Sequence, residues 1–252
     1  MAELKLPTET VTLPSKGLLY PKESPLSKGE VEMKYMTAKE EDILTNSNFI
    51  QQGTVIDKLL QSLIVTKINF DELLIGDKNA ILIAARVLGY GKDYSFKYTN
   101  EHNQELEATV DLSKLSDKEL DTNLFKEGIN EFSFATPKTG DLLTFKLLTH
   151  GDEKKIEAEI KGLKKVNPTN SYDVTTRLKY MITSVNGKRE IKDIREYIDG
   201  YLLAPDARAL REYYAKIQPD VNLKFIPDDD SYTGEGLAIP ISLSFFWPDS
   251  GI

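Results

Sequence analysis

Alternating apolar and polar residues mark the clearest strands, in the middle of the chain. Tyr94, Phe96 and Tyr98 alternate with polar residues, and the alternation resumes from Leu106 to Leu112 after a polar tip. Successive side chains of a strand point to opposite faces of its sheet. The pattern therefore predicts an antiparallel β-hairpin with one apolar face.

A second hairpin of the same plan is predicted at the C-terminal end. Residues 221–225 and 237–245 alternate in the same way, and an acidic, glycine-containing tip at 228–236 separates them. Three shorter segments also read as strands, at 31–35, 129–135 and 142–148.

Apolar residues spaced three and four positions apart predict helices between these strands. In the first half they cover residues 38–47, 54–66 and 77–88, with Thr37 and Glu40 as a capping box and Asp77 as a helix cap. In the second half they are marked by Ile156–Leu163, Val174–Val185, Ile191–Ile198 and Pro205–Ile217.

These elements predict an α+β fold: helices with two similar antiparallel β-hairpins and an extended N-terminal arm. The prolines at positions 14 and 21 exclude a helix near the N-terminus. We expect three parts: the arm and first strand at 1–37, a helical segment with the first hairpin at 38–127, and a strand pair, helical segment and C-terminal hairpin at 128–252.

Composition narrows the class of partner. The 252 residues carry a formal net charge of -8, which disfavours a phosphate backbone as a partner. The longest apolar run, Ala80–Ala85, is too short to span a bilayer, so we expect no membrane insertion. The absence of cysteine excludes disulfides and thiolate metal sites.

No arrangement of residues indicates catalysis, a cofactor or a metal. The two histidines, His102 and His150, stand in different segments and are interpreted as exposed loop residues. The acidic turn Asp228–Asp230 lacks the spacing of a calcium loop, although ion binding there stays open. We expect a protein that is not an enzyme. The alternative kept among enzymes is a carboxylate-based hydrolase.

Two segments are candidates for binding a protein partner. In Phe245-Phe246-Trp247-Pro248, a continuing strand would direct successive aromatics to opposite faces, and large exposed aromatics tend to be binding hot spots. An extended, apolar, proline-containing arm can lie in a partner's groove or add to its sheet, or pack on its own domain. The candidate partner-binding residues are Leu13, Pro14, Leu18, Leu19, Tyr20, Phe246 and Trp247.

Four segments, in their order along the chain, resemble the T4-type phage baseplate hub family, also described as baseplate hub assembly chaperones. They are Leu13-Pro14-Ser15-Lys16-Gly17, Thr37–Asp42, Arg86–Gly91 and Phe245-Phe246-Trp247-Pro248. In related sequences the hairpin tips resemble zinc ribbons with paired cysteines. Here the tips, 99–103 and 227–232, hold no cysteine, so the hairpins are zinc-ribbon-like in plan only.

The resemblance implies a protein of the contractile tail that is made in the host cytoplasm and helps to build the baseplate hub. Its partners would be other tail or baseplate hub proteins, with the tape-measure protein as a further candidate. Two roles remain open: a subunit of the virion baseplate, or a transient assembly chaperone that is absent from the virion.

Overall fold

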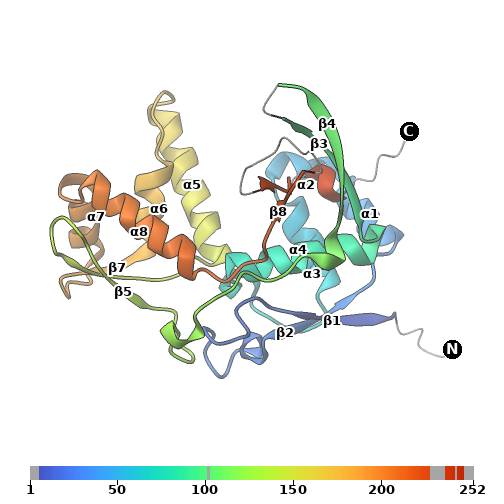
Figure 1. Ribbon diagram of the computed structural model, residues 1–252, viewed down its shortest axis with the longest axis horizontal. Helices are drawn as coiled ribbons and strands as arrows, with labels where there is room; N and C mark the ends of the chain where they lie inside the picture. Colours follow the sequence, from blue (N-terminus) through green and yellow to red (C-terminus); the bar gives the residue numbers. More distant parts are fainter. Residues whose placement is uncertain (1–5, 101–102, 228–235, 242, 247–252) are drawn as a thin grey trace.

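Two short strands near the N-terminus form the first sheet of the protein (Figure 1). The computed structural model describes residues 6–100, 103–227, 236–241 and 243–246. Strand β1 (Thr8–Thr12) pairs antiparallel with β2 (Glu30–Lys34), with Val11 opposite Val31. Val31 and Met33 are buried while their neighbours are exposed. The alternation predicted at 31–35 is thus confirmed.

Four helices follow: α1 (Ala38–Leu44), α2 (Ser47–Gln52), α3 (Val55–Leu63) and α4 (Ile75–Tyr90). The predicted capping box is present, because Glu40 Oε2 accepts from the backbone N–H and the hydroxyl of Thr37. Gly91, with a positive φ of 84° that glycine adopts readily, is the C-cap of α4.

The central hairpin has the predicted register. Strand β3 (Asp93–Thr99) pairs antiparallel with β4 (Glu105–Asp111), so that Tyr94 faces Val110 and Phe96 faces Ala108. Tyr94 and Phe96 are buried on the apolar face of the hairpin.

The three-stranded sheet that follows has the order β5-β6-β7, all antiparallel. Strands β5 (Phe132–Ala135) and β6 (Leu142–Phe145) fall in the predicted segments. Strand β7 (Ile182–Val185) was not predicted: Val185 was assigned to a helix because it continues the apolar spacing of Leu178 and Met181. That assignment is wrong, since the helix ends at Met181.

The helices of the second half are α5 (His150–Val166), α6 (Asp173–Met181), α7 (Ile191–Gly200) and α8 (Ala204–Ile217). Pro205 lies in the first turn of α8, where its missing N–H has no intrahelical partner to lose. Short 3₁₀ turns complete the described elements: Pro25–Lys28, Phe70–Glu72, Leu112–Lys114, Thr122–Leu124 and Leu243–Phe246.

The C-terminal hairpin is shorter than predicted. Strand β8 (Lys224–Phe225) and β9 (Leu237–Ala238) pair over two residues each, against seven in the central hairpin. The Phe225 ring packs edge-on against Phe96 of β3, with ring centres 4.9 Å apart. The central and C-terminal hairpins thus pack together through aromatic contacts.

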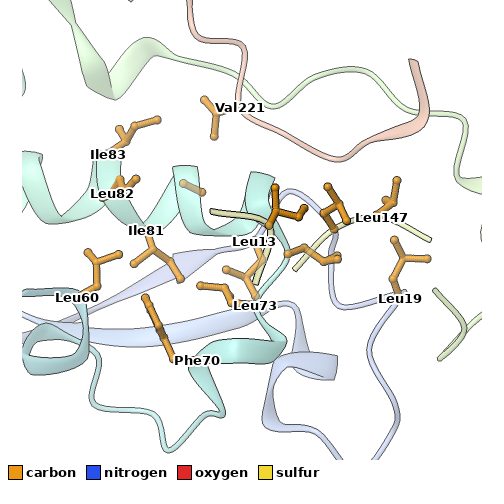
Figure 2. Packing of buried hydrophobic residues seen from close by; sticks show 14 of the residues in the cluster. Leu13, Leu19, Leu60, Phe70, Leu73, Ile81, Leu82, Ile83, Leu147 and Val221 are labelled. Atoms are coloured by element: carbon orange, nitrogen blue, oxygen red, sulfur yellow. The ribbon is translucent and has the colours of Figure 1, made fainter. Parts of the chain in front are cut away.

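Buried side chains from distant segments share one core. Figure 2 shows Leu13, Leu19, Leu73, Ile81 and Leu147 among the gathered side chains around α4. Figure 1 shows α4 near the middle of the molecule, with the first sheet below it and the helices α5 to α8 to one side. Helices and small antiparallel sheets together confirm the α+β class. In the described ranges, no helix combines the length and apolar character that a membrane crossing requires.

Candidate partner-binding surface

The N-terminal segment is not a free arm. Leu13, Leu19 and Tyr20 are 1%, 2% and 4% exposed, Pro14 is buried, and Leu18 is half-buried. The expectation that these side chains are available to a partner is therefore wrong for all but Leu18, because they pack into the core of their own chain. Partner binding by the segment as a whole stays a prediction.

A carboxylate from α4 fastens this segment. Asp77 Oδ1 accepts from the backbone N–H of Ser15 at 2.9 Å, and Oδ2 accepts from the Ser15 hydroxyl at 2.7 Å and the Tyr20 hydroxyl at 2.6 Å. Tyr20 Oη in turn accepts from the backbone N–H of Leu74 at 2.9 Å. These contacts join residues at least 54 positions apart in the sequence.

Burial governs the ionisation of this pair. It raises the pKa of Asp77 above its ordinary value, although the hydrogen bonds from Tyr20 and Ser15 oppose the change. Burial also raises the pKa of Tyr20, and the neighbouring charge of Asp77 raises it further. Tyr20 therefore stays protonated and keeps its role as a donor.

Asp77 does not cap α4 as predicted. It is the third residue of the helix, and Leu74 stands at the N-cap. Its side chain is fully buried and turns to Ser15 instead of to the helix backbone. The spacing of apolar residues locates the start of a helix but carries no information about a partner 62 residues away.

A tight turn shapes the segment next to this anchor. Lys16 and Gly17 both have positive φ, at 51° and 75°. A Cβ on Gly17 would lie 2.3 Å from the carbonyl oxygen of Ser27, so only glycine fits there. The turn brings the chain back over the 3₁₀ turn that contains Leu26 and directs Leu19 and Tyr20 into the core.

A groove of about 640 Å³ lies beside the anchored segment, and we call it the arm groove. Buried Leu19, Tyr20 and Leu74 line it together with more exposed residues. The full lining is Leu19, Tyr20, Pro21, Glu23, Ser24, Pro25, Asn69, Asp71, Glu72, Leu74, Asn130 and Thr149.

Carboxylates give the arm groove its charge. Asp71 pairs with Lys154 of α5 at 3.1 Å, and Glu72 accepts from Asn69 Nδ2 at 2.9 Å. Glu23 is exposed and carries no ion pair within the described part of the chain. Apolar side chains together with free acceptors suit an extended segment of another protein that offers N–H or cationic donors.

A smaller hollow, of about 460 Å³, lies next to residues 14–16 of the same segment. Pro14, Ser15 and Lys16 line it together with residues around Asp117 and Phe125. Burial raises the pKa of Asp117, and the charge of Lys16 partly opposes that change. The anchored segment thus contributes to two hollows.

The C-terminal aromatics do not form an exposed strand. Leu243–Phe246 is a 3₁₀ turn, and Phe246 is 1% exposed with its ring edge-on to Phe245 at 5.2 Å. Both rings are buried in the core of the chain, so the assignment of Phe246 as an exposed anchor is wrong. Trp247 lies outside the described residues.

His150 is buried, contrary to the expectation of an exposed loop residue. It is the first residue of α5, with Nε2 2.9 Å from Asp57 Oδ2 of α3 and Nδ1 3.1 Å from Lys78 Nζ of α4. Its ring meets Phe70 edge-on at 4.7 Å. Lys78 also pairs with Asp57 at 3.0 Å. The cluster joins three helices, and local periodicity gave no signal for it. His102 lies outside the described residues.

No metal centre is formed by the described residues, where no group of three or more His, Asp or Glu side chains is placed to hold an ion. Asp228–Asp230 lies outside the described residues, as do parts of both hairpin tips.

Comparison with known families gives a match over most of the chain. The model of the family described as T4 bacteriophage base plate protein matches residues 8–184, which include every residue that lines the arm groove. No curated protein and no solved structure matches the chain.

Proposed function

Since the chain belongs to the T4 bacteriophage base plate protein family, we propose that it is a hub protein of the tail baseplate, acting in assembly through contacts with other proteins. It works by binding and not by catalysis. Its partners are other baseplate hub or tail proteins. It binds them in the host cytoplasm during assembly and remains bound to them in the virion.

The arm groove is the observation that carries this proposal. Its walls come from segments far apart in sequence: residues 19–25, at the end of the anchored segment, residues 69–74, Asn130, and Thr149 at the N-cap of α5. The Asp77 hydrogen bonds hold one wall in place before any partner arrives. Because a preformed groove needs little ordering of its backbone and side chains when a partner binds, the entropy cost of binding is small.

The groove chemistry favours an extended partner segment. Pro21 and Pro25 fix the backbone at its edge, and the carboxylates of Glu23 and Glu72 offer acceptors there. A partner segment with basic or amide side chains would satisfy these acceptors, while an apolar side chain would cover Leu19 and Leu74.

Reversal of one groove charge tests the proposal. The Glu23→Lys variant, produced together with the other baseplate proteins of the phage, should no longer co-purify with its hub partner. Glu23 is exposed and outside the core, so folding should be unaffected. Glu196→Lys on α7 makes the same charge change at an exposed site away from the groove and should co-purify normally.

Equal co-purification of Glu23→Lys and the unaltered protein would rule out the arm groove as the contact surface. Loss of co-purification in both charge variants would point to net charge and would equally contradict a groove-specific contact.

A further inference from the structure

One edge of strand β1 pairs with no other strand of the described residues. The partner of β1 on its other side is β2, and the two-stranded sheet has no other member within the described residues. The phase of the hydrogen bonds is fixed at both ends of the pair. The N–H of Leu13 donates to Gly29 O at 2.8 Å, and the N–H of Tyr35 donates to Pro7 O at 3.3 Å.

That phase decides which backbone groups point outward. In an antiparallel pair, every second residue exchanges hydrogen bonds with its partner strand, and the residues between them point away. Residues 7, 9, 11 and 13 therefore face β2. The N–H and C=O groups of Thr8, Thr10 and Thr12 face the open edge, and all three residues are exposed.

This edge lacks the usual protection. Natural edge strands are often protected from pairing with another chain by a proline, a charged side chain (lysine above all) or a bulge. Residues 8–12, Thr-Glu-Thr-Val-Thr, contain no proline, lysine or bulge and pair with β2 in regular register, and their one charged side chain, Glu9, accepts from the Tyr35 hydroxyl. The other edge of the sheet is partly covered, because Glu32 O accepts from Val65 N–H and Glu32 N–H donates to the Thr66 hydroxyl.

We propose that the open edge of β1 pairs antiparallel with β1 of a second copy of this chain, with Thr10 opposite Thr10 across a two-fold axis. The two β1–β2 sheets then form one four-stranded sheet. The contact is isologous, so each copy uses the same five residues.

The order of side chains supports a second copy as the occupant. With Thr10 on the axis, Thr8 faces Thr12 of the second copy, so every outward hydrogen-bonding position pairs threonine with threonine. Such pairs are favourable across antiparallel strands. Glu9 faces Val11, so no like charges stand directly opposite each other, and the two Glu9 side chains are diagonal neighbours. The Glu9 carboxylate is also occupied by the Tyr35 hydroxyl at 2.9 Å.

A strand pair of this length buries less surface than the roughly 1,200 Å² or more of stable complexes. The dimer should therefore be reversible, with a fraction that rises with protein concentration. This inference concerns a surface separate from the arm groove and does not depend on the hub assignment.

The absence of native cysteine makes the test direct. Facing residues of a hydrogen-bonded antiparallel pair have Cα atoms about 5.5 Å apart, within the range that a disulfide spans. Under mild oxidation, Thr10→Cys should form a disulfide dimer roughly tenfold or more faster than Thr169→Cys, because pairing raises the effective concentration of the thiols. Thr169 is an exposed control between α5 and α6.

A second pair of variants guards against chance cross-linking. Thr10→Pro removes the outward N–H without touching the bonds to β2, and should abolish concentration-dependent dimerisation in sedimentation velocity. Thr10→Val keeps the N–H and should still dimerise. Circular dichroism checks that both variants fold.

Three results would overturn the proposal. The first is that the unaltered protein stays monomeric at every concentration, even if β1 then pairs with a different protein. The second is equal cross-linking of Thr10→Cys and Thr169→Cys. The third is a dimer that Thr10→Pro leaves intact.

Discussion

The hydroxyl of Tyr20 donates to Asp77 Oδ2 at 2.6 Å and ties the N-terminal segment to the first turn of α4. The same hydroxyl oxygen accepts from Leu74 N–H, so one side chain satisfies two buried groups. This bond positions the wall of the arm groove that Leu19, Tyr20 and Pro21 form.

Tyr20→Phe should lower the free energy of unfolding by about 1–3 kcal/mol, because Leu74 N–H and Asp77 each lose a buried partner. Tyr35→Phe is the matched control, since its hydroxyl donates to exposed Glu9, and it should cost no more than about 0.5 kcal/mol. Urea denaturation measures both. Equal losses in the two variants would show that the Tyr20 bond does not anchor the segment.

Glu40 should make stability depend on acid pH. Burial alone would raise its pKa, but hydrogen bonds from Lys34, Thr37 and Ser62 outweigh burial and lower it from 4.5 to about 2. A lowered pKa adds stability above the unfolded value, and that stability is lost as pH falls from 4.5 toward 2.

Glu40→Gln should thus be less stable than the unaltered protein by about 2–3 kcal/mol at neutral pH, and the difference should shrink between pH 4.5 and 2. Urea denaturation across this range measures it, with exposed Glu41→Gln as the control that should show little difference. A difference independent of pH would argue against the ionised form of Glu40 as the stabilising one.

Two helical glycines should respond in opposite directions to alanine. A Cβ on Gly76 would lie 1.7 Å from Pro219 O, so Gly76→Ala must push α4 and residue 219 apart and should cost at least about 2 kcal/mol. Gly162 of α5 has open space around it, so Gly162→Ala should stabilise the protein by up to about 1 kcal/mol. Thermal unfolding compares them; a neutral Gly76→Ala would contradict the close approach.

The cluster around His150 should be costly to break. Lys78→Met removes the cation beside Asp57 and His150, and the Lys78 and Asp57 side chains are only 18% and 20% exposed. We expect a loss of about 2–4 kcal/mol in the free energy of unfolding. Arg208→Met, in an exposed pair with Glu212, should change it by about 0.5 kcal/mol or less. Comparable losses would mean that the buried cluster adds nothing beyond a surface pair.

The spacing of apolar residues predicted most helices and strands, but it did not predict the contacts between them. The alternation around Tyr94 and Phe96 located the central hairpin because one of its faces is buried. Val185 was misassigned because apolar spacing alone does not separate the end of a helix from a short buried strand. The Tyr20–Asp77 and Lys78–His150 contacts join residues more than 50 positions apart, and no local pattern records such pairs.

The most direct test of the central claim is quantitative mass spectrometry of purified virions alongside isolated tail-assembly intermediates. A hub subunit should be present in mature virions at a whole-number ratio to a known hub protein. Presence in the intermediates alone would contradict that claim and identify an assembly chaperone, and absence from both would contradict a baseplate role altogether.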